Sequence, residues 1–459
     1  MRIAHLAAAL IAATAVPAAA QPDPAQPGPA AQVSEARLRA DVEALVGFGT
    51  RHTLSDQASP TRGIGAARRW GEAQFRAISE ECGGCLEIVL PERIVTGNRV
   101  PQPTRLVNVV AIQRGTERPG EVVIVQGHID SRVSDVMDAT SDAPGANDNA
   151  SGTALVIEAA RVLSRQRYPT TIVYALLSGE EQGLLGGQLL ADYAVEQGWT
   201  VKAVLNNDIV GGSCGSDGFC DAEHVRVFSE GPRADLDEQA RAAQRRNGGE
   251  NDSPGRNLSR FVAGLAEGSG GLAVRQVWRA DRMGRGGDQT PFLERGYPAI
   301  RFSVAVEDYE HQHQDLRTEG GITYGDTVDE MDFPYLAGVT RLNVRALNHL
   351  ARAPMPPSPT AEAALRTFTE LAWDEVPGAA EYRIYQRRTD ETRWPAMPTL
   401  SVEAADHSDN ADQRDFVWQL EGVRGDDWIF GVSSVAADGT ESPIASAVPG
   451  GGFAPLVKD

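Results

Sequence analysis

The chain has 459 residues, of which 41 % are hydrophobic and 23 % are charged, as expected of a globular protein with room for two or three domains. Its 43 basic and 63 acidic side chains give a formal net charge of −20 at pH 7. This acidic surplus argues against nucleic acid and anionic membrane surfaces as partners, because both attract basic proteins.

The N-terminus has the features of a secretory signal. Arg2 precedes the short, Ala-rich apolar run Ile3–Val16, and a small-residue cleavage site follows. The alternative is an uncleaved membrane anchor, and no other stretch could span a bilayer. We therefore predict a signal peptide at 1–20, a proline-rich mobile linker at 21–32, and an exported protein of the periplasm or the medium with no membrane span after cleavage.

The four cysteines suit an exported protein, in which disulfides persist. Of the three pairings that four cysteines allow, the local one needs no long-range geometry, so we predict Cys82–Cys85 and Cys214–Cys220. A redox centre at the Cys-x-x-Cys motif and a zinc site of four thiolates are the alternatives. The second is the weaker because the two pairs lie far apart in the chain.

The first half of the chain alternates predicted helices and strands. Ser34 can cap a helix that Gly47 ends. Period-3.6 and β-branched patterns then predict, in order, a helix at Arg68–Ile78 and strands at Leu106–Ile112, Glu121–Val125 and Thr171–Ala175.

Polar residues follow the strand at Glu121–Val125. His128 and Asp130 stand one residue apart and so share a face, where the carboxylate can orient the imidazole. Asp148 then lies in a Gly/Asn-rich turn before a helix. A helix N-cap or a turn preference would by itself explain Asp148.

Glu180 and Glu181 follow the buried strand Thr171–Ala175. Two adjacent carboxylates in a low-dielectric site repel each other, and a metal ion is the usual compensation. One carboxylate can then bind the ion while the other carries a proton. The alternative is the N-terminus of a helix, where acidic residues complement the dipole.

Two later strands also end in chemistry-bearing residues. Val201–Leu205 leads to Asp208, and Pro298–Val306 leads to His311 and His313. Open α/β sheets bind ligands at the carboxyl ends of their strands, so the five segments would converge on one edge. Histidines and carboxylates together form a ligand set suited to a pair of Zn²⁺, Mn²⁺ or Co²⁺ ions.

Together these segments resemble the M28-type zinc metallopeptidases, from about Leu38 to Ala353. The motifs that carry the resemblance are Gly127–Asp130, Gly145–Gly152, Gly179–Gly186, Asn207-Asp208 and the late histidines. The resemblance implies a mixed β-sheet between helices and the removal of N-terminal residues from peptides.

The resemblance also implies a role for each site residue. His128 and Asp208 would hold one zinc ion, Glu181 and a late histidine the other, and Asp148 would bridge them. Asp130 would support His128, and Glu180 would be the general base. The late motif is His311-Gln312-His313, and we assign the ligand to His313 because comparable members carry Gln-His there. Gly211–Gly287 is long and rich in loops, so the resemblance does not identify substrate-pocket residues within it. Asp288, which follows this segment, is a candidate supporting residue.

The tail is a separate predicted domain. After the peptidase-like domain at 33–353, which ends with a helix at Asn343–Ala351, a proline-rich boundary leads to short β-rich segments at 360–459. They suit a β-sandwich and resemble a fibronectin type III domain. Its aromatic residues could bind a polymer or form the core.

The sequence therefore predicts an α/β fold with a small all-β domain, and a co-catalytic zinc exopeptidase, most simply an aminopeptidase, that acts on peptide substrates. One alternative is a carboxypeptidase or a glutaminyl cyclase on the same scaffold, and Arg282, Arg285 and Arg317 could supply the cation that a carboxypeptidase needs. Another is a non-catalytic binding protein, although such a protein has no need for Glu180. The sequence does not indicate an oligomeric state.

Overall fold

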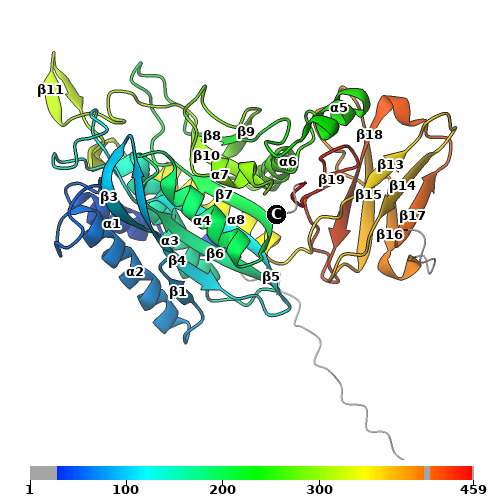
Figure 1. Ribbon diagram of the computed structural model, residues 1–459, viewed down its shortest axis with the longest axis horizontal. Coiled ribbons are helices and arrows are strands. Elements are labelled where there is room, and N and C mark those ends of the chain that lie inside the picture. The colour runs from blue at the N-terminus through cyan, green and yellow to red at the C-terminus, as the bar shows by residue number, and fades with distance from the viewer. Residues whose placement is uncertain (1–27, 408–413, 457–459) are drawn as a thin grey trace, which may run out of the picture.

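The computed structural model describes residues 28–407 and 414–456, so the predicted signal peptide lies outside the described residues. Figure 1 shows a larger α/β domain beside a smaller β domain. Within the described ranges, no helix has the length and apolar character needed to cross a membrane.

An eight-stranded mixed sheet forms the centre of the α/β domain, in the order β1-β4-β6-β5-β7-β10-β8-β9. Its four middle strands, β6, β5, β7 and β10, run parallel, and β4 and β8 pair antiparallel with the outer two of these. The carboxyl ends of the four parallel strands therefore meet at one edge. The strands are β1 Glu87–Val89, β4 Val109–Gln113, β5 Arg118–His128, β6 Thr170–Leu177, β7 Thr200–Asn207, β8 His224–Phe228, β9 Ala273–Val277 and β10 Ala299–Val304.

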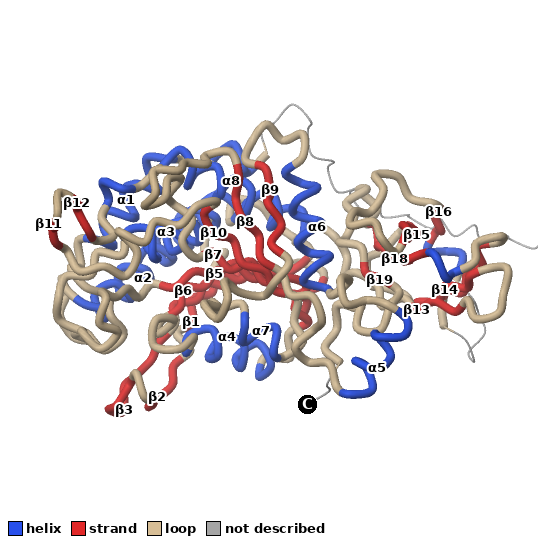
Figure 2. Tube along the Cα trace, turned by 90° about the horizontal axis from the view of Figure 1, so that it is seen from above, coloured by secondary structure: helices blue, strands red, loops and turns tan. Residues whose placement is uncertain are grey.

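Helices cover both faces of this sheet, as Figure 2 shows. Alternate residues of β5 enter opposite cores, with Val123 and Val125 on one side and Val122 and Ile124 on the other. A strand buried on both faces is apolar throughout, which is why the middle strands were recognisable in the sequence. One face is covered by α1 Glu35–Val46, α2 Gly63–Glu81, α3 Ser151–Leu163, α6 Pro254–Ala266 and α8 Phe333–Leu350, and the other by α4 Leu185–Glu196 and α7 Thr290–Glu294.

The segment Gly211–Gly287 lies mostly outside helices and strands, as expected. It contains β8 and β9, which extend the sheet, and the helices α5 Glu238–Asn247 and α6. The β8 sequence His-Val-Arg-Val-Phe alternates in polarity, and Ser253-Pro254 is a helix start with a side-chain cap on Arg256 N. The strand pattern and the helix start are therefore visible in the sequence, but each spans only a few residues, and β8 and β9 lie toward the edge of the sheet.

Several predicted boundaries shift in the structure. The expected strand Leu106–Ile112 divides at Asn108 into β3 Val100–Val107 and β4, because the Asn108 side chain binds Ser178 N and Gly186 O instead of continuing the ladder. The closing helix α8 begins ten residues earlier than predicted. The end of the predicted mobile linker forms a 3₁₀ turn, η1 Pro29–Gln32, with Pro29 buried.

The remaining elements of this domain are short. β2 Glu92–Gly97 pairs with β3 in a separate hairpin, and β11 Arg317–Glu319 pairs with β12 Ile322–Tyr324 in another. Helical turns lie at η2 Ala146–Ala150 and η3 Val328–Glu330. Both predicted disulfides, Cys82–Cys85 and Cys214–Cys220, are present.

The C-terminal domain consists of two antiparallel sheets. The first has the order β13-β14-β17 and the second β16-β15-β18-β19. Trp373, Tyr382 and Phe416 fill its core with ring contacts of 4.7–5.6 Å between centroids, so these aromatic side chains pack the interior. The elements are β13 Thr360–Glu362, β14 Thr369–Trp373, β15 Glu381–Arg388, β16 Leu400–Glu403, η4 Ala404–Asp406, β17 Phe416–Leu420, η5 Gly425–Asp427, β18 Trp428–Val435 and β19 Ala445–Ser446.

Candidate metal centre

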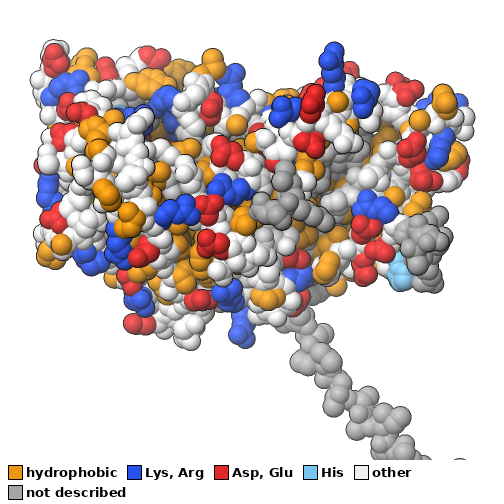
Figure 3. Space-filling view, viewed as in Figure 1, with side chains coloured by type: hydrophobic (Ala, Val, Ile, Leu, Met, Phe, Trp, Pro, Cys, Tyr) orange, Lys and Arg blue, Asp and Glu red, His pale blue; other side chains and the backbone are white. Residues whose placement is uncertain are grey.

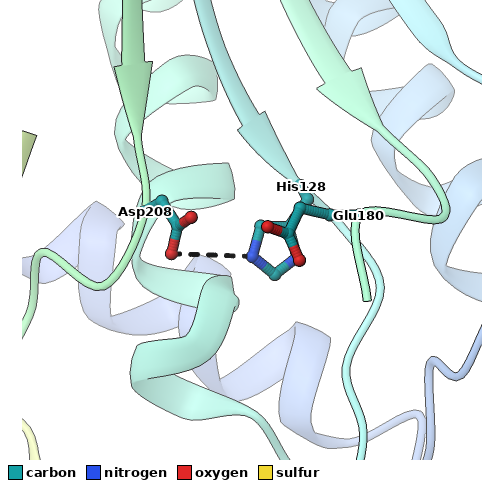
Figure 4. Close-up of side chains that lie close together, drawn as sticks. All are labelled: His128, Glu180 and Asp208. Carbon is teal, nitrogen blue, oxygen red and sulfur yellow. Dashed lines mark ion pairs between the residues drawn. The ribbon is translucent and has the colours of Figure 1, made fainter. Parts of the chain in front are cut away.

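The ends of β5, β6 and β7 bring a histidine and two carboxylates together. Figure 4 shows the side chains of His128, Glu180 and Asp208 facing one another, and each offers a ligand atom within 4.8 Å of the others. Nε2 of His128 lies 3.8 Å from Oδ1 of Asp208. It also lies 3.2 Å from Oδ1 of Asp148, on the turn before α3.

A second cluster lies next to the first and shares Asp148 with it. Nε2 of His313 is 2.9 Å from Oδ2 of Asp148 and 3.0 Å from Oε1 of Glu181. Asp148 therefore directs one oxygen at His128 and the other at His313. Glu180 belongs to the first cluster and Glu181 to the second, although the two residues are neighbours in the chain.

These residues fit a pair of metal ions. Nδ1 of His128 donates to the main-chain oxygen of Asp130 at 3.1 Å, so in the neutral ring Nε2 carries the lone pair, and this atom is buried without a hydrogen-bond partner. A lone pair that faces the carboxylates of Asp148 and Asp208 needs a cation between them. At the second cluster, an ion would displace the proton that His313 directs at its carboxylates. Imidazole and carboxylate ligands suit Zn²⁺.

Asp130 is fully buried and lies where a supporting residue is needed. Its carboxylate accepts hydrogen bonds from the main-chain N–H groups of Glu180 and Glu181 and from the hydroxyl of Thr53. It also lies 3.6 Å from Nδ1 of His128. Asp130 thus connects the end of β5 to the end of β6.

Two residues that sequence analysis missed hold the Asp148 turn. Arg51 is fully buried and donates to the carbonyl oxygens of Leu45, Ile129, Pro144 and Gly145. Asp326 accepts from the main-chain N–H groups of Asn147 and Asp148, at 2.8 and 2.7 Å. No local pattern marks either residue, since each acts on segments far away in the chain.

Gly145 is required at the start of this turn. Its φ of +52° is in the left-handed region, and a Cβ here would lie 2.5 Å from Cβ of Ser131. The glycine therefore allows the turn to approach β5 closely.

Two further arginines contact the clustered carboxylates. Nη2 of Arg301, a fully buried residue of β10, lies 2.8 Å from Oδ1 of Asp208. Arg132 donates to Oε2 of Glu181 at 2.8 Å and to Nδ1 of His313 at 2.6 Å. Both residues partly offset the negative charge of the site, and neither was singled out from the sequence.

Two carboxyl groups, one in the first cluster and one beside it, have raised pKa values. Burial raises the pKa of Glu180 well above its usual range, against the opposing effect of His128, and the Asp208 carboxylate adds to the rise. Burial likewise raises the pKa of Asp288 to about 7. Asp288 binds Gly187 N at 3.0 Å with one oxygen, and its other oxygen is buried without a partner. Asp288 thus lies beside the site without joining either cluster.

The other residues singled out from the sequence lie elsewhere. His311 pairs with Asp308 and Glu330 and is not in either cluster. Arg282 and Arg285 both pair with Glu307, and Arg317 pairs with Glu319 on the β11–β12 hairpin.

Known proteins resemble this chain in sequence. The model of peptidase family M28 matches residues 108–320. A probable zinc metalloprotease of Leptosphaeria maculans is 42 % identical over 426 residues, which cover 91 % of this chain and 96 % of that protein. A probable zinc metalloprotease of Pyricularia oryzae is 40 % identical over 431 residues, covering 91 % and 83 % of the two chains.

Solved structures share the fold of the larger domain. LapB of Legionella pneumophila superposes with a TM-score of 0.51 at 19 % identity, over 70 % of this chain and 74 % of that chain. The LapA aminopeptidase of the same organism gives a TM-score of 0.51 at 19 % identity, over 70 % and 71 %. At this level of identity the likeness concerns the fold alone.

Proposed function

The chain belongs to peptidase family M28, and on that premise we propose that it is an exported aminopeptidase that uses two zinc ions to remove N-terminal residues from peptides. Two relatives that match over 91 % of this chain carry the name probable zinc metalloprotease. Export is supported by the predicted signal sequence and by the two disulfides.

The observation that carries the proposal is the shared carboxylate of Asp148, which lies 3.2 Å from His128 Nε2 and 2.9 Å from His313 Nε2. A carboxylate between two ligand clusters is the arrangement of a two-metal site. In the proposal Asp148 bridges the ions, and each ion has one histidine and one further carboxylate. The metal-holding residues are then His128, Asp148, Glu181, Asp208 and His313.

The bound ions would supply the Lewis acidity that polarises a peptide carbonyl and acidifies water. Glu180 takes up the proton of the attacking water and delivers it to the leaving amine. Its half-buried position beside His128 and Asp208 suits this task, because the partial loss of solvent raises the pKa of the carboxyl group and helps it hold the proton between the two transfers. Asp130 acts indirectly, by orienting His128 and by holding the main chain of Glu180 and Glu181.

The charges around the site favour an aminopeptidase over a carboxypeptidase. A carboxypeptidase needs a cation that is free to bind the terminal carboxylate of its substrate. Arg282 and Arg285 already share the carboxylate of Glu307, at 2.7 and 3.3 Å. Arg317 is on a hairpin and stacks on Tyr324.

Hydrolysis of L-alanine 4-nitroanilide and of its N-acetylated copy tests the proposal. We expect release of nitroaniline from the free amine, little from the acetylated compound, and loss of activity with a chelator that zinc restores. Equal cleavage of both compounds, or release of residues from the C-terminus of a peptide, would contradict the aminopeptidase assignment and leave the metal site intact.

A further inference from the structure

A cavity of about 270 Å³ lies between the two domains, away from the proposed metal centre. Residues of α6, β9 and α8 form one side of it, and the segments that precede β16 and β19 form the other. Figure 1 and Figure 2 both show α6 facing the smaller domain. Small-molecule sites occur preferentially at domain interfaces and have volumes from about 300 Å³ upward, so this cavity suits one compact ligand.

Apolar side chains form much of the wall of this cavity. Phe261, Trp394 and Ile444 line it. Nε1 of Trp394 donates to Oδ1 of Asn257 at 3.1 Å, and the ring of Phe261 packs edge-on against the ring of His349, with 5.1 Å between the centroids. Aromatic rings that are held in place favour an aromatic ligand, because ring contacts add to the gain from burying apolar area.

His349 also lines the cavity and offers a hydrogen-bond acceptor. Its Nε2 lies 2.7 Å from the main-chain oxygen of Glu441, which only accepts, so Nε2 carries the proton. Burial lowers the pKa of His349, which favours the neutral ring. Nδ1 then carries a lone pair, and it has no hydrogen-bond partner among the residues that the structure describes. A purely apolar ligand would leave this acceptor unpaired, whereas a hydroxyl group on the ligand's ring would donate to it.

A pair of opposite charges lies on the solvent side of the cavity. Nη1 of Arg393 is 2.8 Å from Oε1 of Glu267, and these lining side chains are 74 % and 63 % exposed. An exposed pair of this kind contributes little to stability, so a ligand can replace it at small cost. A carboxylate would pair with Arg393 and an ammonium group with Glu267, and a free amino acid carries both groups on one carbon atom.

From this arrangement we propose that the cavity binds one free amino acid with a hydroxylated aromatic ring, such as tyrosine. The ring packs against Phe261 and Trp394, and its hydroxyl group donates to Nδ1 of His349. The α-carboxylate pairs with Arg393 and the α-ammonium group with Glu267. Because both domains supply walls, the bound ligand stabilises their association. The inference goes beyond the proposed aminopeptidase function and does not depend on it.

Calorimetric titration with L-tyrosine tests the proposal on two variants. Arg393→Gln removes the partner of the carboxylate, and Gly264→Leu fills the cavity, since Gly264 lines it and a Cβ there would meet nothing within 4 Å. We expect Kd to rise about tenfold or more in Arg393→Gln, and Gly264→Leu to bind one molecule fewer per chain. Hydrolysis of L-alanine 4-nitroanilide should be unchanged in both.

Two matched controls should bind L-tyrosine like the wild type. Arg388→Gln removes an equal charge from an exposed pair with Asp427. Gly120→Leu adds an equal side chain at an exposed glycine of β5 whose Cβ would also meet nothing within 4 Å. L-Phenylalanine lacks the hydroxyl group and p-cresol lacks both charges, so each should bind the wild type about tenfold more weakly or worse than L-tyrosine does.

The outcomes separate this inference from the proposed function. The cavity assignment is wrong if the wild type does not bind L-tyrosine, or if p-cresol or L-phenylalanine binds as tightly. It is also wrong if Arg393→Gln and Gly264→Leu bind L-tyrosine like the wild type while L-tyrosine competes with L-alanine 4-nitroanilide, because the amino acid would then occupy the proposed metal centre. A wild type that hydrolyses no free-amine substrate would refute the aminopeptidase assignment alone.

Discussion

At the scale of single residues, Glu180 and Glu181 are neighbours in the chain but lie in different chemical environments. The carboxylate of Glu181 accepts a hydrogen bond from Arg132 and lies 3.0 Å from Nε2 of His313. Glu180 is half-buried beside Asp208 and Glu181, and the loss of solvent around it raises its pKa well above the usual range. This difference supports the proposed roles, with Glu181 as a ligand and Glu180 as the proton carrier.

We expect Glu180→Gln to keep the full metal content while kcat falls by roughly 10²–10⁴, the usual contribution of general acid–base catalysis. The substitution removes the proton acceptor and retains the size of the side chain. Zinc analysis and steady-state kinetics on the same preparation provide the measurement. A variant with normal turnover would remove Glu180 from the mechanism, and a variant that loses an ion would make it a ligand.

The two late histidines make a second comparison at this scale. His313 contacts Asp148 and Glu181, whereas His311 contacts Asp308 and Glu330. We expect His313→Ala to bind one zinc ion fewer and to lose most activity, and His311→Ala to retain both ions. Metal analysis of the two variants decides the assignment, since full occupancy in His313→Ala is incompatible with its role as a ligand.

At the scale of elements, the turn that carries Asp148 depends on hydrogen-bond partners from other segments. Arg51, between α1 and α2, ties the end of β5 to this turn through the carbonyl oxygens of Ile129, Pro144 and Gly145. Asp326, after the β11–β12 hairpin, holds the same turn from its other side. The carboxylate of Asp148 is thus positioned by parts of the chain that contribute no proposed ligand.

Arg51→Met should destabilise the protein by at least about 2 kcal/mol, because it leaves the carbonyl oxygens of Ile129 and Pro144 without a donor, whereas those of Leu45 and Gly145 keep main-chain donors. It should also weaken zinc binding, since the Asp148 turn loses its anchor. Arg76→Met is the control: Arg76 pairs with Glu72 on the surface of α2, and its loss should cost no more than about 0.5 kcal/mol. Urea unfolding of both variants measures the difference, and equal midpoints would show that Arg51 does not hold the turn.

At the scale of the whole molecule, the two domains share buried polar contacts. Oδ1 of Asp252, in the α/β domain, lies 2.5 Å from Arg387 on β15 and accepts from the hydroxyl of Ser446 on β19. Arg233 donates to the carbonyl oxygens of Gly450, Gly452 and Ala454 near the end of the chain. We expect the domains to unfold together.

Asp252→Ala should lower the stability of the protein by about 3–5 kcal/mol, because it leaves the buried guanidinium groups of Arg260 and Arg387 without their carboxylate. The control is Asp427→Ala, which breaks an exposed pair with Arg388 and should cost less than about 1 kcal/mol. Calorimetry measures both effects. Two separate transitions in the wild type would contradict the joint unfolding of the domains.

The surface at this scale agrees with the composition. Figure 3 shows acidic and basic side chains interspersed over the face in view, with no broad basic area. A binding face for nucleic acid would gather basic side chains. The face in view has no such gathering.

The sequence by itself determined the middle strands and the residues that follow them. Strands buried on both faces are apolar throughout, and His128, Glu181 and Asp208 come directly after such runs, so their order along the chain was enough to place them at one edge. The local disulfides were predictable for the same reason, since each pair is closed by a short stretch of chain.

Only the tertiary structure decided the partners of these residues. Arg132 and His313 are 181 residues apart in the chain, and Arg51 reaches Gly145 over 94 residues, so no local pattern could join them. The same holds for Arg301 on Asp208, for Asp326 on the Asp148 turn, and for the edge strands inside Gly211–Gly287. The proposed ligand residues are marked by the strands that precede them, whereas the residues that hold them are selected by packing across the fold.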